Sequence, residues 1–224
     1  MRILERLPRE TGRDFALRTI KENIIDLTLE PGSQISENEL AAELGLSRTP
    51  VREALIELSK MKIVTIAPQK KSVVGLIDYD MVDESRFLRN LLECAVTELN
   101  CRTASPKDLD RLRENVRLQR FYLQEGNSER LMALDDQFHM ILFETAQKSQ
   151  VYELMENFSV HFDRVCRMAR TPVKDLRIVQ DHEEILEAIA RQDAAAAREL
   201  MDLHLNRYKI DAMGIREQYP QYIK

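Results

Sequence analysis

Three histidines and one aspartate are spaced so that they could bind a divalent metal ion together. Asp135 and His139 are four positions apart, so in a helix they project from the same face. His182 lies about ten residues before the turn predicted at 191–193, and His204 lies about eleven residues after it. At about 1.5 Å per residue, both lie about 15 Å from that turn, and hence at one level of an antiparallel helix pair. Three imidazoles and one carboxylate form a ligand set that suits Zn²⁺, Ni²⁺, Mn²⁺ or Fe²⁺.

Other interpretations of these histidines stay open. Each could instead be a hydrogen-bonded core or surface residue, since single histidines usually are. His161, the fourth histidine, fits no ligand position, and we expect it to be structural or to line a pocket on the fourth bundle helix. A metal-bound water would also permit a hydrolytic enzyme, but no further general base is evident.

A second kind of chemistry lies near the N-terminus, where two arginines share one face of a predicted helix. Arg48 and Arg52 are four residues apart, just after a short helical pattern that ends at Gly45. Two short helices joined by a glycine-bearing turn form a helix-turn-helix. A narrow helix that carries arginines fits the DNA major groove, where it can contact guanine edges and phosphates.

Local signals place the ends of these two helices. Ser36 and Glu39 have the spacing of a capping box, which predicts the start of the first helix. Gly45 suits a left-handed residue at its C-terminus, and Ser47 is the predicted N-cap of the second helix. Pro50 then lies in the first helical turn, where a missing N–H does no harm.

The flanking segments extend the helix-turn-helix to a winged helix. An amphipathic helix over about 16–27 precedes it, and two short strands over 63–66 and 73–74 follow it. Between these strands lies a basic turn with Lys70 and Lys71. Without these neighbours, an ordinary helical hairpin with solvated arginines would be the better interpretation.

Residues 15–76 resemble the DNA-binding domain of the GntR transcriptional regulators. The resemblance is carried by Pro31-Gly32, by the Leu40-Ala41-x-x-Leu44-Gly45 motif and by residues 47–55. It implies that operator DNA is contacted by polar and basic residues of the helix-turn-helix and wing: Asn38, Ser47, Arg48, Thr49, Arg52, Lys70 and Lys71. Lys71 replaces a glycine usual in the family's wing, and Asn38 replaces an arginine found in many members, so we expect a different base preference.

Composition agrees with a soluble intracellular protein, whereas the overall net charge by itself argues against non-specific binding to nucleic acid. The net charge of the 224 residues is −5, with 33 Lys+Arg against 38 Asp+Glu. Residues 1–76 hold 12 against 11, a net of +1, and the remainder holds 21 against 27, a net of −6. Only the N-terminal part is therefore suited to approach DNA. The three cysteines show no C-x-x-C pairing, and we expect neither a membrane span nor a secretory signal.

From about residue 79 the pattern is helical throughout. Apolar residues recur at helical spacing over 88–99, and further helices are predicted at about 106–126, 128–148, 150–170, 174–191 and 193–213. Six helices with short connections imply an antiparallel bundle. We therefore predict a mainly α protein with two domains. Residues 1–76 form the winged helix-turn-helix with a small β-hairpin wing, and residues 77–224 form an antiparallel all-α bundle.

Residues 79–215 resemble the FCD effector domain of the FadR subfamily of GntR regulators. Its motifs are Arg89-x-x-Leu92-Glu93, Asp135-x-x-Phe138-His139, His182-x-x-Ile185 and Met201-x-x-His204. The resemblance implies that Asp135, His139, His182 and His204 bind the metal, as the aligned residues do in metal-binding members. It also implies a small organic-acid effector, for which the arginine clamp is predicted from Arg89 first, with Arg164 and Arg86 as weaker candidates.

These observations predict a DNA-binding regulator rather than an enzyme. A single winged helix buries little surface, so we expect a homodimer on a palindromic operator. The carboxylate effector would dock on the metal and change DNA affinity. The alternative within the same class is a dedicated metal sensor, for which the ion alone is the signal.

Overall fold

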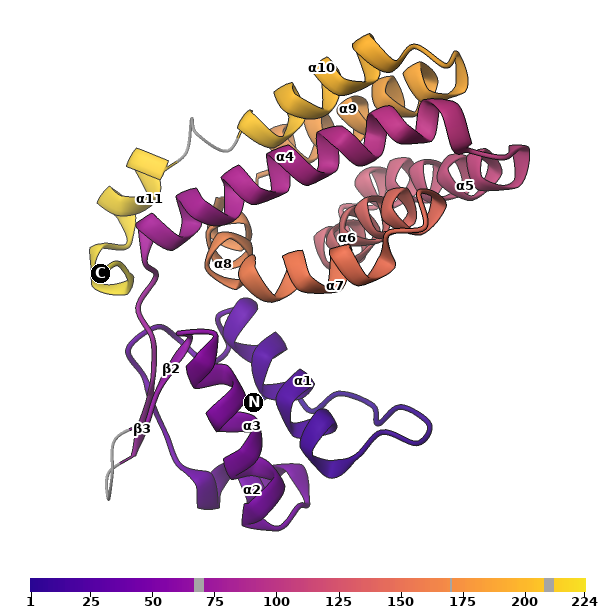
Figure 1. Cartoon of the computed structure of the whole chain (residues 1–224). Helices are drawn as coiled ribbons and strands as arrows, with labels where there is room; N and C mark the ends of the chain where they lie inside the picture. Colours follow the sequence, from indigo (N-terminus) through magenta and orange to yellow (C-terminus); the bar gives the residue numbers. More distant parts are fainter. Residues whose placement is uncertain (67–70, 170, 208–211) are drawn as a thin grey trace. The chain divides into compact units, whose positions relative to one another are not determined.

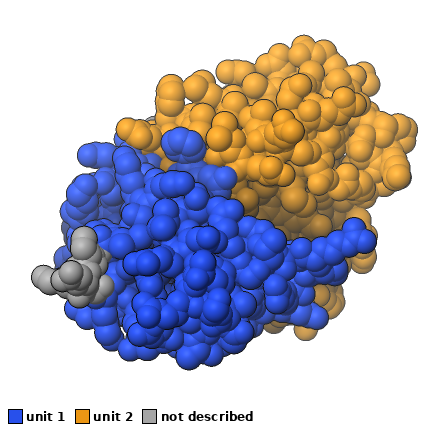
Figure 2. Space-filling view, turned by 60° about the horizontal axis from the view of Figure 1, so that its bottom comes forward, with its two compact units in different colours: residues 1–83, 157–168, 212–224 blue, residues 84–156, 169–211 orange. Residues whose placement is uncertain are grey.

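The computed structural model describes residues 1–66, 71–169, 171–207 and 212–224 of the chain (Figure 1). Within it the chain forms two compact units, coloured separately in Figure 2. Unit 1 contains Met1–Asp83, Asn157–Met168 and Ala212–Lys224, and unit 2 contains Glu84–Glu156 and Ala169–Asp211. This division describes packing within the chain, and the domain boundary after residue 76 stays a prediction.

Unit 1 contains the winged helix. Its elements, in order, are α1 (Gly12–Ile25), β1 (Gln34–Ile35), α2 (Glu37–Leu44), α3 (Arg48–Lys60), β2 (Val64–Thr65) and β3 (Ser72–Val74). The strands form an antiparallel sheet in the order β1-β3-β2, in which Val73 of β3 is opposite both Gln34 and Thr65. Strand β1 was not predicted, because two residues are too few to show an alternating pattern. Helices α1, α2 and α3 close over one apolar core that includes Ile20, Leu40 and Leu55.

The helix ends confirm most of the local signals and correct one. Helix α2 begins after Ser36 as predicted, but the capping box is wrong, since the Ser36 side chain makes no capping hydrogen bond. Glu39, its expected partner, instead lies 3.1 Å from Lys71 Nζ. Gly45 is left-handed at φ 64°, as predicted for the end of α2. Ser47 occupies the N-cap position of α3, without a side-chain capping bond.

Unit 1 also contains three later segments. They are α8 (Val160–Ala169, to Met168), α11 (Ala212–Gln218) and the 3-10 helix η2 (Pro220–Tyr222). Val160 of α8 is fully packed in the apolar core of the winged helix. Ile223 forms a β-bridge with Ile77 beside the start of α4. The winged helix is thus supported by residues that lie far away in the sequence.

Unit 2 is an antiparallel helical bundle, which confirms the predicted fold class. It contains α4 (Tyr79–Thr103, from Glu84), α5 (Pro106–Gln124), α6 (Ser128–Thr145), α7 (Ser149–Phe158, to Glu156), α9 (Pro172–Ala190) and α10 (Ala194–Asn206). The core between these helices includes Leu112, Phe138, Ile185 and Met201. Figure 1 shows α4 alongside α9 and α10, and α5 alongside α6. This packing brings the inner faces of α4, α6, α9 and α10 together.

Two predicted bundle helices differ from those observed. The helix predicted over 150–170 is two helices, because Ser159 ends α7 and its carbonyl accepts the first helical bond of α8, from Asp163 N at 2.8 Å. The apolar pattern continues across Ser159, so periodicity alone did not reveal this break. The helix predicted to reach residue 213 ends at Asn206, and residues 208–211 lie outside the described part. None of the helices in the described ranges is long and apolar enough to cross a membrane.

Candidate functional site

The predicted DNA-binding face lies at the start of α3. Arg48 and Arg52 are both exposed, with 67% and 69% of their side-chain surface accessible. Glu37, the first residue of α2, lies beside both of them. Its carboxylate is 3.6 Å from Arg48 Nη2 and 3.4 Å from Arg52 Nε. The two guanidinium groups are therefore held on one side of the helix-turn-helix.

The remaining predicted DNA contacts are also on the surface of unit 1. Asn38 of α2 and the residues Ser47 and Thr49 at the start of α3 are exposed. Lys71 is exposed and forms an ion pair with Glu39 of α2. Lys70 lies outside the described residues. The structure thus presents the described members of this set to solvent, where DNA could reach them.

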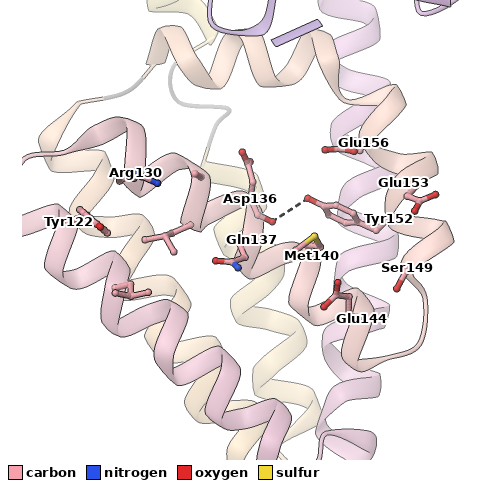
Figure 3. Close-up of a pocket in the computed structure, with 13 residues that line it drawn as sticks. Tyr122, Arg130, Asp136, Gln137, Met140, Glu144, Ser149, Tyr152, Glu153 and Glu156 are labelled. Atoms are coloured by element: carbon pink, nitrogen blue, oxygen red, sulfur yellow. Dashed lines mark hydrogen bonds between the residues drawn. The ribbon is translucent and has the colours of Figure 1, made fainter. Parts of the chain in front are cut away.

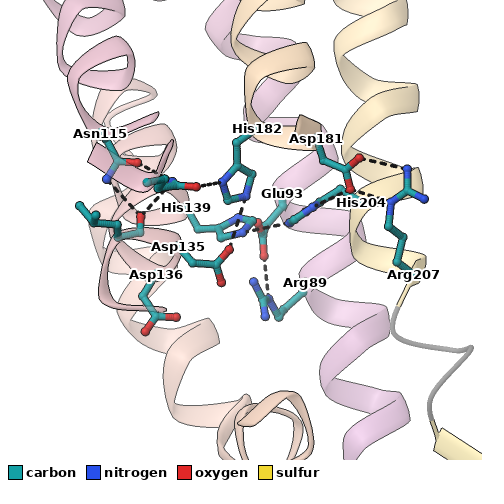
Figure 4. A network of polar contacts seen from close by, with 12 residues as sticks. Arg89, Glu93, Asn115, Asp135, Asp136, His139, Asp181, His182, His204 and Arg207 are labelled. Atoms are coloured by element: carbon teal, nitrogen blue, oxygen red, sulfur yellow. Dashed lines mark hydrogen bonds and ion pairs between the residues drawn. The ribbon is translucent and has the colours of Figure 1, made fainter. Parts of the chain in front are cut away.

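The predicted metal ligands are brought together inside unit 2. Asp135 and His139 come from α6, His182 from α9 and His204 from α10, and one ligand atom of each lies within 4.8 Å of the others (Figure 4). His204 Nε2 is 3.3 Å from His139 Nε2, and His182 Nε2 is 3.6 Å from Asp135 Oδ1. The structure thus brings together the four residues that were predicted as metal ligands. Metal binding itself stays a prediction.

Each of the three imidazoles has a different polar partner at its Nδ1 atom. His139 Nδ1 contacts the Glu93 carboxylate, and His182 Nδ1 is 2.8 Å from the amide oxygen of Gln119. His204 Nδ1 is 3.3 Å from Asp181 Oδ2. These contacts favour the tautomer with hydrogen on Nδ1, which leaves Nε2 as the atom available to a metal. The rings are thus oriented so that their Nε2 atoms face one another, as in Figure 4.

The donor set fits a cation. His139 and His182 are at most 2% exposed, and the side chain of His204 is 8% exposed. Asp135 Oδ1 is buried and accepts no hydrogen bond from the described residues. A buried carboxylate oxygen without a donor is costly, and a bound cation would relieve that cost. The chemistry of the four side chains is that of a borderline divalent metal site.

Two buried carboxylates beside the cluster, Glu93 and Asp181, are each paired with a histidine and an arginine. Burial opposes ionisation of Glu93, yet Arg89 and His139 hold the pKa of its carboxyl at about 2. Burial likewise works against a charged His139, but the Glu93 carboxylate raises the pKa of His139 above its ordinary value. Burial would raise the pKa of Asp181, but His204 and Arg207 lower it. The cluster therefore holds ionised carboxylates next to imidazoles.

The three predicted effector arginines occupy different places. Arg89 lies on α4 beside the cluster, with Nε 2.7 Å from Glu93 Oε1. Arg86, also on α4, donates from Nη1 to Asn206 of α10 at 2.9 Å. The structure does not bring Arg164 into the cluster, because this buried residue belongs to unit 1 and donates to the Gly75 carbonyl. Arg89 is thus linked to the cluster through Glu93, which contacts the predicted metal ligand His139.

Sequence reasoning missed the side chains that support the ligands. Glu93 had the clearest signal, since it lies one helical turn after Arg89 on the face toward the bundle core. Asp181 directly precedes His182, but its pairing with Arg207, at 2.6 Å, needs the packing of α9 on α10. Gln119 gave no signal, because an amide within an amphipathic helix is unremarkable.

A pocket of about 670 Å³ in unit 2 has none of the four predicted metal ligands among its lining residues (Figure 3). It is lined by residues of α5, α6 and α7, among them Tyr122, Arg130 and Tyr152. Gln137 at its edge accepts a hydrogen bond from the buried Asn115, which in turn accepts one from Gln119. The polar contacts of the cluster thus extend through α5 to this edge.

His161 is a buried structural residue, which is one of the two expected roles, but it does not lie in the helical bundle as predicted. It lies on α8 in unit 1, 2% exposed, and its Nδ1 accepts a hydrogen bond from Asp78 N at 3.2 Å. Burial, and then the nearby Arg164, lower the pKa of His161 to about 4. The residue is therefore neutral at physiological pH.

Comparison with protein families gives two matches that follow each other along the chain. The family of bacterial regulatory proteins named gntR matches residues 13–74, and the FCD domain matches residues 84–207. The first match covers the winged helix, and the second covers all four predicted metal ligands.

Curated relatives match over nearly the whole length. The sequence is 32% identical to an HTH-type transcriptional regulator in an unstable DNA locus of Streptomyces ambofaciens, covering 95% of this chain and 89% of that protein. It is 28% identical to the HTH-type transcriptional repressor RspR of Escherichia coli strain K12, covering 90% and 89%.

Solved structures with the same fold include McbR/YncC of Escherichia coli. That chain has a TM-score of 0.79 at 21% identity, covering 94% of this chain and 99% of the other. A putative GntR regulator from Rhodococcus sp. RHA1 has a TM-score of 0.74 at 23% identity, covering 90% and 97%. At these identities the likeness concerns the fold.

Proposed function

Because the chain belongs to the GntR family of transcriptional regulators and carries an FCD domain, we propose that a small carboxylate effector, bound at a divalent metal, controls its affinity for operator DNA. The protein is a DNA-binding transcriptional regulator and not an enzyme. The metal, the effector and the control of DNA affinity are the proposed parts. As a regulator of transcription it is proposed to act in the cytoplasm.

The observation that carries the proposal is the cluster of ligand atoms in unit 2. Three imidazole Nε2 atoms and one orphaned carboxylate oxygen face one another across less than 5 Å. An ordinary bundle core would fill this space with apolar side chains, because burying polar atoms without partners destabilises the fold. Asp135, His139, His182 and His204 would hold the metal, which would serve as a Lewis acid for an anionic ligand.

A carboxylate is the ligand that suits such a site. Four protein ligands leave coordination positions on an octahedral metal, or room for a fifth ligand on Zn²⁺. Carboxylate oxygens are hard anionic donors that can occupy those positions. Arg89 is the nearest of the predicted arginines, and a guanidinium can bind a carboxylate with two hydrogen bonds.

The DNA side of the proposal rests on the exposed face of α3. Arg48 and Arg52 would enter the major groove, with Lys70 and Lys71 of the wing on the phosphates. A homodimer would place two such helices on the two halves of a palindromic operator, about one helical turn apart. A dimer would also double the area of contact with DNA, which is small for a single winged helix.

The metal is tested by elemental analysis of protein purified without chelator and without a nickel column. We expect about one equivalent of a divalent metal per chain, retained after gel filtration. His182→Ala and His204→Ala should each abolish it, whereas Asp136→Asn, the exposed acid next to Asp135, should retain it. Failure of the parent protein to take up Zn²⁺, Ni²⁺, Mn²⁺ or Fe²⁺, even on reconstitution, would return these histidines to a structural role.

A further inference from the structure

Of the three side chains that contact an imidazole Nδ1 atom, Glu93 has its own combination of burial and partners. Glu93 of α4 is fully buried, and one of its oxygens contacts His139 Nδ1 while the other is 2.7 Å from Arg89 Nε. Gln119, the partner of His182, is neutral, and its amide nitrogen donates to Asn115 and to the Leu134 carbonyl. His182 and His139 are therefore held by groups of different charge.

Asp181, the partner of His204, is also a carboxylate, but it contacts two arginines. Arg207 binds it through two nitrogens, at 2.6 and 3.0 Å, and Arg177 Nε lies 3.1 Å from Oδ1. Two guanidinium groups thus neutralise this carboxylate, so less of its charge acts on His204. Glu93, by contrast, contacts the guanidinium of Arg89 with one oxygen and the imidazole of His139 with the other.

We propose that Glu93 is a positioning residue for the metal, which fixes His139 and strengthens it as a ligand, and that Arg89 acts on the metal through Glu93. This inference rests on the proposed function, since it concerns the same metal. A carboxylate that accepts the Nδ1–H of an imidazole fixes the ring, sets the tautomer with Nε2 toward the ion and makes Nε2 more basic. An amide oxygen, as on Gln119, does the same more weakly.

The contacts from Arg89 to Glu93 and from Glu93 to His139 also affect how an Arg89 substitution should be interpreted. Arg89 is the counter-ion of a fully buried carboxylate, so its removal leaves Glu93 without that partner and frees it to shift away from His139. A loss of effector response in an Arg89 variant would then include a loss of metal. The two effects are separated only if metal affinity is measured without effector and without DNA.

The test uses the full-length protein with Zn²⁺ and Co²⁺ as the probes. Zn²⁺ affinity is measured by competition with a chromophoric chelator, and the ligand field is read from the visible absorption of bound Co²⁺. Glu93→Gln should weaken Zn²⁺ binding by about 10–100-fold and shift the Co²⁺ bands. Glu183→Gln is the matched control, because Glu183 follows His182 and is also paired with an arginine, Arg120, but lies near the surface.

A second variant keeps the test valid if Glu93→Gln fails to fold. The double variant Arg89→Gln/Glu93→Gln removes both charges, so that neither group is left buried without its counter-ion. It should show the same weakening and the same spectral shift. Wild-type affinity and an unchanged Co²⁺ spectrum in either folded variant would overturn the role of Glu93 while leaving the metal site intact. Absence of metal binding in the parent protein would instead overturn the proposed function itself.

Discussion

The contacts of Arg48 and Arg52 in the free protein are weak compared with those that DNA can offer. Exposed ion pairs such as those with Glu37 contribute about 0–1 kcal/mol. A bidentate arginine–guanine contact discriminates by about 1–3 kcal/mol. If α3 binds DNA as proposed, we therefore expect DNA to displace Glu37 from Arg48 and Arg52.

Substitution of either arginine should weaken specific operator binding. We expect Arg48→Ala and Arg52→Ala each to lose about 1–3 kcal/mol of binding free energy, measured by fluorescence anisotropy on a selected operator. Arg113→Ala is the control, since Arg113 is also exposed and paired with an acid, Asp110, but lies on α5 in unit 2. If all three variants bound the operator as tightly as the parent, the major-groove assignment of α3 would be wrong.

Metal binding should depend on pH in a way that reflects His139. The Glu93 carboxylate raises the pKa of His139, so this residue keeps its second proton above the ordinary imidazole pKa of about 6.5. A metal must displace that proton from Nε2, and apparent affinity should therefore fall with decreasing pH from a point above about 6.5. Competition with a chelator between pH 5.5 and 8.5 measures this apparent metal affinity. An affinity that does not vary over this range would exclude imidazole ligands.

The residues that could be predicted were those whose positions depend on one helix or one hairpin. Asp135 and His139 share a face by helical spacing alone, and His182 and His204 share a level because their hairpin is short. Glu93 and Gln119 approach the same point from α4 and α5. Their meeting depends on packing between non-consecutive helices, which a single sequence does not specify.

At the level of elements, helix ends were predicted correctly where short sequence motifs determine them. The left-handed Gly45 and the capping box of α5 at Ser105 and Asp108, with Pro106 between them, follow local rules. Ser36 has the same kind of motif, but its side chain makes no capping bond, and the Glu39 carboxylate pairs with Lys71 instead. The break at Ser159 is set by tertiary packing, since Val160 beyond it belongs to the core of unit 1.

Helix α8 should make unit 1 sensitive to acid through His161. Its folded-state pKa of about 4 is below the unfolded value of about 6.5, so between these values only the unfolded chain takes up the proton. Stability is therefore present above pH 6.5 and is lost as pH falls toward 4. The loss is at most about 3 kcal/mol. Protonation of Nδ1 would also break the bond from Asp78 N.

Denaturant unfolding of the parent and of His161→Gln at pH 7.0 and 5.0 tests this prediction. Glutamine can accept the Asp78 bond without taking up a proton. The parent should lose more stability between the two pH values than the variant does, whatever their absolute stabilities. Equal losses would assign the acid sensitivity to other groups.

At the scale of the whole molecule, the two candidate sites belong to different units. The α3 face lies in unit 1 and the metal cluster in unit 2, while α4 begins in unit 1 at Tyr79 and carries Arg89 and Glu93 in unit 2. Helix α4 therefore connects the two units covalently, a few residues after the wing. The sequence predicted both sites, but not that α8 and the C-terminal segment pack with the winged helix.

The most direct test of the account is the affinity of the metal-loaded protein for a selected operator, with and without a small carboxylate that stabilises it in a thermal-shift screen. We expect a change of about 5–150-fold in operator affinity, and an equal change in carboxylate affinity when operator is present, because the coupling is reciprocal. His204→Ala should abolish both changes. Operator affinity that responds to metal alone would identify a metal sensor. Carboxylates that bind the metal-loaded protein but leave operator affinity unchanged would contradict the proposed control of DNA binding.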